Sequence, residues 1–441
     1  MNKSAISQHP KWPNKKHYNN VIQALREYPN LVFPNEIIAL KKELLEVSLG
    51  NKFIIQGGDC AETFNNFNDE MIKNKLKILL QMSAIIQFTT KIRVTNIGRI
   101  AGQYIKPRTN LYETRDKITL PSYRGDGVNS IDFNKEKRIP NPDNLTRAYH
   151  QSSATMNLIR TLIMSGFTDI ENIQLWHRDI LDKTRLGNKY NMIVEKIKNA
   201  FEFIETSSDF NNYKTFHQYN FYTSHEALLI DYEKSFLQQY HSKQYCCSGH
   251  MLWLGDRTRH KDSKQVKFLS SINNPIGIKV GPKTDLQDLN IICTKLNPLN
   301  EKGKIILILR LGEKHIKKVL PKIIKSTYNH KHEVLWFCDP MHGNTIKLKN
   351  GFKTRRFATI IRELKHFFSI ITEHHLVPGG VHFELTGEKV TECLGGIGNI
   401  TDKDLNQRYE TTCDPRLNNE QSLEIAFLIS ELIKGKEIKN V

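Results

Sequence analysis

The sequence predicts an α/β protein built as a (β/α)8 TIM barrel with an N-terminal helical extension and inserted helices. Three observations favour this fold. Short apolar runs end in polar or glycine-rich loops, segments with helical periodicity alternate with these runs, and the 441 residues suffice for one decorated barrel. Alternation of strand and helix is typical of βαβ units and therefore of a parallel sheet.

Two parts of the chain are expected. Residues 1–50 hold a polar arm followed by a helix over Glu36–Val47, where Leu and Ile recur near helical spacing. Residues 51–441 form the catalytic barrel. A helical insertion is predicted around 130–220, because that stretch contains more helix than one crossover needs.

Nine apolar runs are candidate strands, although a closed barrel needs eight. Either NIQLWH or FYTSHE must lie outside the barrel, and the pattern does not choose between them. The nine runs are 53–60, 94–102, 172–177, 221–226, 250–257, 275–282, 304–312, 333–343 and 381–388.

Composition excludes several other classes. The longest wholly aliphatic run, Ile305–Leu309, is far shorter than the ~20 residues of a transmembrane helix. The N-terminus lacks the apolar segment of a secretory signal. Seven cysteines without a CxxC motif fit reduced thiols, so we expect a cytoplasmic protein without a membrane partner.

The basic charge leaves the kind of partner open. There are 64 Lys and Arg against 46 Asp and Glu, a net charge of +18, which can serve nucleic acid or anionic small substrates. The lysines are spread along the whole chain, and neither an RNP-like run nor a zinc knuckle is present. We therefore expect no nucleic-acid partner, and a non-catalytic nucleic-acid-binding protein stands as the alternative.

Charged or metal-binding side chains stand at the C-terminal end of one apolar run after another. In a barrel these ends converge on one mouth, where the active sites of this fold lie. A solvated rim would favour Lys, Asn and Ser without selecting metal ligands and phosphate binders. The set comprises Cys60, Arg99, Asp256, Arg257, Lys279, Arg310, His342 and Glu384.

The cations of this set predict an anion site. Arg99, Arg257, Lys279 and Arg310 would place four cations in one cavity, which is stable only with an anionic ligand such as a phosphate or carboxylate. The loop GQYIKPRTN (102–110) is either an ordinary basic loop or a second phosphate site. Its candidate residues are Lys106, Arg108 and Thr109.

The remaining residues predict a metal site. Cys60, His342 and Glu384, joined by Asp414, offer a thiolate, an imidazole and two carboxylates. This mixture of soft and hard ligands suits Mn, Fe, Co or Zn better than Mg or Ca.

Ten motifs together resemble the class II (plant-like) 3-deoxy-D-arabino-heptulosonate 7-phosphate synthases, also called phospho-2-dehydro-3-deoxyheptonate aldolases. They run from about Glu27 to Phe427, and their number and order make a chance match improbable. The motifs are EYPNLVF (27–33), QGGDCAE (56–62), GRIAGQYIKPR (98–108), PSYRGDGVN (121–129), TSHEAL (223–228), HMLWLGDRTR (250–259), NPIGIKVGP (274–282), CDPMHGNT (338–345), LTGEKVTECLGG (385–396) and RYETTCDPRLN (408–418).

The resemblance implies a transferase that condenses phosphoenolpyruvate with D-erythrose 4-phosphate and water. The products would be 3-deoxy-D-arabino-heptulosonate 7-phosphate and phosphate, in the first step of the shikimate pathway to chorismate and the aromatic amino acids. The same reaction could instead feed a secondary pathway such as phenazine synthesis. A divalent metal ion, Mn²⁺, Co²⁺ or similar, is the implied cofactor.

The resemblance also assigns residues. Its metal ligands fall on Cys60, His342, Glu384 and Asp414. Its phosphoenolpyruvate site falls on Arg99, Asp256, Arg257, Lys279 and Arg310, and its erythrose 4-phosphate site on Lys106, Arg108 and Thr109. Lys279 and Asp256 are the candidate catalytic groups that position water. Asp256 departs from the family, which usually has Glu there.

Assembly and redox behaviour complete the expectations. The family implies a homodimer or homotetramer, with chorismate mutase as a candidate partner, and the short arm predicts weak or absent inhibition by aromatic amino acids. Cys413 precedes the proposed ligand Asp414, so its sulfur should approach that of Cys60. Either the two form a disulfide in the metal-free enzyme or Cys413 is an inert thiol.

Overall fold

The computed structural model describes residues 8–167 and 221–435, together with positions 169, 172, 175, 176 and 199. Two helices, α1 (Lys15–Arg26) and α2 (Pro34–Ser48), precede the first strand. The second covers the predicted helix. The first was not predicted, although Tyr18, Val21, Ile22 and Leu25 bury one helical face at the spacing i, i+3, i+4, i+7.

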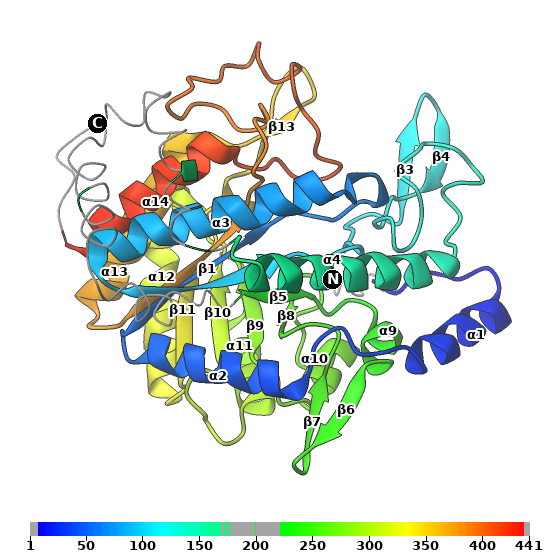
Figure 1. The fold of residues 1–441 in the computed structure, drawn as a ribbon, viewed down its shortest axis with the longest axis horizontal. Helices are drawn as coiled ribbons and strands as arrows, with labels where there is room; N and C mark the ends of the chain where they lie inside the picture. The colour runs from blue at the N-terminus through cyan, green and yellow to red at the C-terminus, as the bar shows by residue number, and fades with distance from the viewer. Residues whose placement is uncertain are drawn as a thin grey trace.

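Within the described residues, eight parallel strands close into a barrel in the order β1-β14-β11-β10-β9-β8-β5-β2 (Figure 1). This confirms the predicted (β/α)8 fold. The strands are β1 (Lys52–Gly58), β2 (Arg93–Arg99), β5 (Phe221–Glu226), β8 (Met251–Leu254), β9 (Ile276–Val280), β10 (Ile305–Leu309), β11 (Val334–Cys338) and β14 (Pro378–Glu384).

FYTSHE is therefore the barrel strand whose assignment the sequence left open. The described residues of NIQLWH, Asn172, Leu175 and Trp176, are helical and belong to no strand of the barrel. The helix α4 (Asp143–Met164) falls within the predicted insertion. The later part of that insertion, 177–198 and 200–220, lies outside the described residues.

Helices cover the outside of the barrel. Two of them, α3 (Asp69–Thr90) and α14 (Asn419–Ile433), pack side by side on one flank (Figure 1). Further helices in the described part of the chain are α9 (Ile230–Lys234), α10 (Lys264–Leu269), α11 (Leu286–Leu296), α12 (Glu313–Asn329) and α13 (Phe357–Glu373). In the described part of the chain, no helix is long and apolar enough to span a bilayer.

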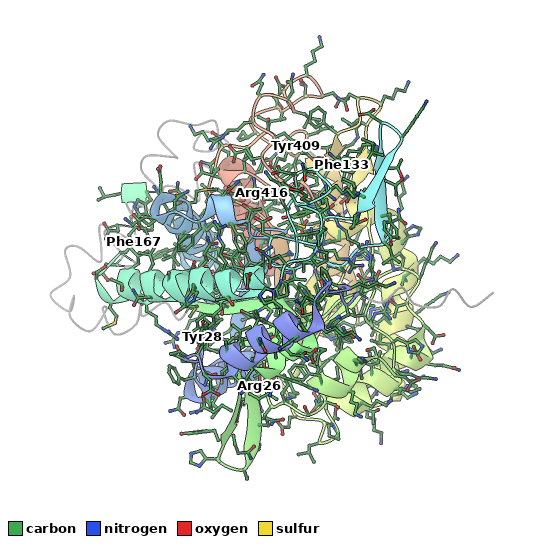
Figure 2. All side chains as sticks on the ribbon, turned by 90° about the vertical axis from the view of Figure 1, so that its right-hand side faces the viewer. Arg26, Tyr28, Phe133, Phe167, Tyr409 and Arg416 are labelled. Carbon is green, nitrogen blue, oxygen red and sulfur yellow. The ribbon has the colours of Figure 1, made fainter. Side chains whose placement is uncertain are left out.

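Among the residues that the structure describes, three hairpins decorate the barrel: β3 (Tyr112–Arg115) with β4 (Ile118–Pro121), β6 (Leu237–Tyr240) with β7 (Lys243–Cys246), and β12 (Ile346–Lys347) with β13 (Lys353–Thr354). The first two project from the body in Figure 1. Phe133 lies beside the β3–β4 hairpin (Figure 2), and the guanidinium of Arg115 is 4.7 Å from the centre of its ring.

The strands are buried on both faces, as parallel barrel strands must be. On β10, Leu307 and Leu309 pack toward the helices, whereas Ile306 and Ile308 pack inside the barrel with Trp253. This alternation follows from the twofold period of a strand. The apolar interior layer lies beneath the carboxyl ends of the strands, which it supports.

Candidate active site at the mouth of the barrel

The carboxyl ends of the strands surround a cavity of about 330 Å³. All the predicted site residues except Glu384 line it, and Glu384 is fully buried beside it as the last residue of β14. The lining residues are Cys60, Arg99, Lys106, Arg108, Thr109, Asp256, Arg257, Lys279, Arg310, His342 and Asp414.

Four potential metal ligands meet in this cavity. The ligand atoms of Cys60, His342, Glu384 and Asp414 all lie within 4.8 Å of one another. The Nε2 of His342 is 3.0 Å from Oε1 of Glu384, and Sγ of Cys60 is 3.5 Å from Oδ2 of Asp414. Three ligands converge because β1, β14 and β11 are neighbours in the barrel. One thiol, one imidazole and two carboxylates suit a divalent transition metal.

The charges around these ligands favour a cation. Burial raises the pKa of the Cys60 thiol, and the carboxylates of Glu384 and Asp414 raise it further. Burial lowers the pKa of His342, but Asp339 and Glu384 outweigh it and raise that pKa to about 9. Both ligands thus hold protons that a metal ion would displace on binding.

Asp339 connects the metal ligands to the cation site. Its Oδ2 accepts hydrogen bonds from Nζ of Lys279 and, at 2.8 Å, from Nδ1 of His342. Its Oδ1 accepts the backbone N–H groups of Met341 and His342 at 3.1 Å. Sequence reasoning missed Asp339, although it follows β11 directly in the chain.

Arg99 enters the cavity from the barrel interior. Its Nη1 contacts Nε2 of His382 at 2.7 Å, and Nδ1 of His382 contacts Oε1 of Gln56 at 2.7 Å. Burial holds the pKa of His382 well below its usual range, so this imidazole is neutral and accepts the Arg99 hydrogen bond. A buried polar layer thereby fixes the guanidinium direction.

Asp256 clamps two guanidinium groups. Its Oδ2 is 2.7 Å from Nη1 of Arg310, and its Oδ1 is 2.9 Å from Nη2 of Arg259. Arg259, which was not predicted, also donates from Nε to the backbone oxygen of Lys279 at 2.8 Å. Both carboxylate oxygens of Asp256 are occupied, and these cations keep its pKa low although burial opposes this.

The loop that carries Lys106, Arg108 and Thr109, here called the KPR loop, contributes side chains to two parts of the cavity. Nζ of Lys106 lies 2.7 Å from Sγ of Cys60 and 3.9 Å from Asp414, so it faces the metal cluster. Thr109 instead accepts hydrogen bonds from Nε and Nη2 of Arg257, at 3.1 and 3.0 Å. Arg108 contacts the backbone oxygen of Tyr123.

A buried carboxylate holds the start of this loop. Glu62 accepts the backbone N–H groups of Ala101, Gly102 and Gln103 at 2.7–2.9 Å. Ala101 has φ +60°, a left-handed conformation that a non-glycine residue adopts at a cost. The three hydrogen bonds stabilise that turn and set the direction of the KPR loop.

The fold and this site define a barrel enzyme with a cationic cavity and a candidate metal centre. The model of the class-II DAHP synthetase family matches residues 1–430. The chain is 42% identical to the phospho-2-dehydro-3-deoxyheptonate aldolase of Streptomyces coelicolor, covering 98% of this chain and 96% of that protein. It is 40% identical to the phospho-2-dehydro-3-deoxyheptonate aldolase AroG of Mycolicibacterium smegmatis, covering 93% of this chain and 89% of that protein. It is 39% identical to the phospho-2-dehydro-3-deoxyheptonate aldolase of Neurospora crassa, covering 97% of this chain and 92% of that protein.

The chain therefore belongs to the class-II DAHP synthetase family. It is an enzyme that condenses phosphoenolpyruvate with erythrose 4-phosphate, the first step of the shikimate pathway. This family is generally metal-dependent, in keeping with the candidate cluster.

The two cysteines at the metal cluster predict sensitivity to air. Both Cys60 and Cys413 line the mouth cavity. Burial would raise the pKa of Cys413, but the neighbouring Cys60 thiol and the charge of Lys106 outweigh it and lower that pKa to about 6. In the metal-free enzyme we expect both thiols to give two electrons and two protons to O₂, forming a disulfide and hydrogen peroxide and abolishing activity.

Bound metal should protect the enzyme, and Cys413→Ser should resist air. Peptide mapping without reductant measures the bond. Recovery of Cys60 and Cys413 as free thiols from air-inactivated enzyme would contradict this mechanism and favour an inert Cys413.

Proposed function

We propose that both substrates and the metal ion meet in the mouth cavity. Arg99, Arg257, Lys279 and Arg310 bind phosphoenolpyruvate, while the KPR loop binds erythrose 4-phosphate through Arg108 and Thr109. The observation that supports this is the common opening of the cation set and the four-ligand cluster into one cavity.

The metal is held by Cys60, His342, Glu384 and Asp414, and we propose Mn²⁺ or Co²⁺ for this mixed ligand set. When bound, it supplies positive charge that polarises the aldehyde of erythrose 4-phosphate. Lys106, against Cys60 and Asp414, borders both the metal and the second substrate.

The cations orient the reacting carbon of phosphoenolpyruvate. Guanidinium groups bind phosphate and carboxylate oxygens bidentately. Alignment of two reactants can lower the activation barrier of their reaction by ~7–11 kcal/mol. Burial lowers the pKa of Lys279 to about 8, although the carboxylate of Asp339 opposes this decrease. Lys279 is therefore mostly protonated at neutral pH and able to bind an anion. Asp256 serves by positioning Arg310, because both its oxygens hold guanidinium groups.

A phosphate-release assay tests this function. With phosphoenolpyruvate, erythrose 4-phosphate and Mn²⁺ or Co²⁺, the enzyme should release one phosphate per phosphoenolpyruvate consumed, and EDTA should stop it. Release without erythrose 4-phosphate would show a simple phosphatase, and no release with either metal would reject the proposal.

Substitutions should separate the two substrate sites. Arg310→Ala should raise KM for phosphoenolpyruvate about tenfold or more and lower kcat, since the lost contact also orients the carbon. Arg108→Ala should raise KM for erythrose 4-phosphate instead. Arg257, which hydrogen-bonds Thr109, should affect both. Steady-state kinetics with each substrate varied measures this, and identical effects of Arg310→Ala and Arg108→Ala would refute the division.

We propose assembly into a homodimer or homotetramer, with chorismate mutase as a candidate partner. The β3–β4 hairpin exposes the large side chains of Tyr112 and Ile118, 58% and 57% accessible, on its two opposite faces, and we propose that Ile118 contacts a second copy of the chain. Light scattering should give two or four chains, and Ile118→Glu should lower this number. A monomeric wild-type protein would contradict the proposed assembly. Co-elution of this protein with chorismate mutase in size-exclusion chromatography tests the proposed partner.

A further inference from the structure

A carboxyl group outside the predicted set faces the same cavity. Glu226 is the last residue of β5 and lines the mouth beside Gly255 and Trp253 of the neighbouring β8 region. A Cβ atom on Gly255 would lie 1.8 Å from Oε1 of Glu226 and 2.6 Å from its Cδ. The carboxyl group of Glu226 therefore occupies the space that a side chain at position 255 would take, and the glycine lets it lie against the loop after β8.

Glu226 differs from the other acids of the cavity. Asp256 is paired with Arg310, and Asp414 lies 3.2 Å from Lys353. Glu113 lies 3.2 Å from Arg138. Among the described residues, by contrast, no Lys, Arg or His approaches the Glu226 carboxyl group within salt-bridge distance, and its buried Oε1 has no hydrogen-bond partner there.

A buried carboxyl oxygen without a partner is costly, so a carboxyl group that lines a cavity and lacks a charged partner calls for a polar ligand. The cations that face it are Lys279 on β9, Arg257 after β8, Lys106 after β2 and Arg99 on β2. Burial raises the pKa of Glu226 from its ordinary value, and these cations oppose the rise, Lys279 and Arg257 most strongly. Both belong to the proposed phosphoenolpyruvate site.

The chemistry of the reactants limits which group can bind to the carboxyl group of Glu226. A carboxylate repels the phosphate and carboxylate groups that the cations bind, so it must meet a neutral polar group. Beside the phosphoenolpyruvate site, that group is the water consumed by the reaction. We propose that Glu226 is a catalytic residue that takes a proton from the water adding to C2 of phosphoenolpyruvate; this rests on the proposed function of the cavity.

The step balances as follows. C3 of phosphoenolpyruvate bonds to the aldehyde carbon, and the aldehyde oxygen takes up one proton. The water oxygen bonds to C2 and one of its protons moves to Glu226, which returns it to the bridging oxygen as the C2–O bond to phosphate breaks. The second water proton leaves as C2 becomes a carbonyl and replaces the proton taken up earlier. One water is consumed, and hydrogen phosphate departs.

The test is Glu226→Gln, which keeps the shape of the side chain and removes the base. General base catalysis is typically worth 10²–10⁴-fold, so kcat should fall about 100-fold or more. Binding of phosphoenolpyruvate, followed by tryptophan fluorescence because Trp253 lines the cavity, should change less than about threefold. The wild-type kcat should fall as acid protonates Glu226, and Glu226→Gln should lose this acid limb.

Asp256→Asn is the matched control at the same mouth. It should weaken phosphoenolpyruvate binding and keep the acid limb, because Asp256 positions arginines. Glu226→Asp should retain the limb at a reduced rate, and it decides the matter if thermal unfolding shows that Glu226→Gln does not fold.

Three outcomes would overturn the proposal: wild-type kcat in Glu226→Gln, an acid limb that persists in it, or a loss confined to KM for erythrose 4-phosphate. The last would mean recognition of a sugar hydroxyl. Failure of the proposed function is distinct, because the wild type itself would then release no phosphate.

Discussion

Removal of the divalent metal is expected to lower turnover by about 10³-fold or more, and Mn²⁺ or Co²⁺ is expected to restore it. A metal acting on a carbonyl oxygen supplies several kcal/mol of charge stabilisation, and each 1.36 kcal/mol is tenfold in rate. Mutation of the proposed metal ligand Glu384 should lower turnover in the same way as removal of the metal. Glu384 is fully buried, and His342 and Arg355 hold its pKa well below the usual range against the effect of burial.

Glu384→Gln should therefore lose metal and turnover together. Metal content after dialysis, isothermal titration with Mn²⁺ and kcat at saturating substrates measure both losses. Glu388→Gln is the matched control, because Glu388 is a partly buried acid that pairs with Arg408 and is not part of the ligand cluster. Full activity in excess chelator, or wild-type turnover of Glu384→Gln, would contradict the assignment.

The rule that polar residues at strand ends share one mouth predicts three members of this cluster, Cys60, His342 and Glu384, whereas Asp414 lies in the loop between β14 and α14. Cys60 and Asp414 are 354 positions apart, and no local motif connects them. The ligands nevertheless meet, because β1 and β14 are paired from Ile54 with Gly380 to Gly58 with Glu384. Sequence spacing carries no information about that pairing, but the closed barrel guarantees it.

The same rule missed Glu226 for an identifiable reason. Its strand, FYTSHE, was one of two runs competing for a place in the barrel. Without that strand in the barrel, its terminal Glu226 had no reason to face the mouth. The structure settles the choice, since β5 lies between β2 and β8, and Glu226 then joins Arg99 and Asp256 at the same end.

Buried ion pairs between distant segments were beyond sequence reasoning. Arg416, labelled in Figure 2, pairs at 2.8 Å with both Asp59 and Glu392, and so ties the loop carrying Asp414 to the residue before Cys60. Such pairs depend on loop paths that periodicity does not encode. For the same reason the sequence did not show that Lys106 turns toward the metal ligands.

Asp339→Asn should produce the second large effect, because one carboxylate oxygen serves both halves of the site. Asp339 is fully buried and contacts Lys279 and His342 through Oδ2. The amide keeps the shape but removes the charge. His342 then loses the partner that orients its imidazole, a change that typically costs 10–100-fold in metal affinity.

Lys279 is affected through its charge. Burial already lowers its pKa to about 8, and Asp339 is the main group opposing that decrease. Without Asp339 the pKa falls further, so more of Lys279 is neutral at pH 7 and binds phosphoenolpyruvate less well. We expect a kcat lower by about 100-fold, a raised KM for phosphoenolpyruvate, and partial recovery of phosphoenolpyruvate binding at lower pH.

Glu363→Gln is the matched control for Asp339→Asn. Glu363 is buried on the same side and contacts Asn344 in the turn that carries His342, but it contacts neither His342 nor Lys279. Burial raises its pKa to about 8, so it is mostly protonated at neutral pH and Glu363→Gln changes the charge of the site little. Titration with Mn²⁺ should show weaker binding only in Asp339→Asn. Equal Mn²⁺ affinity in the two variants and the wild type would mean that Asp339 does not position the metal ligand.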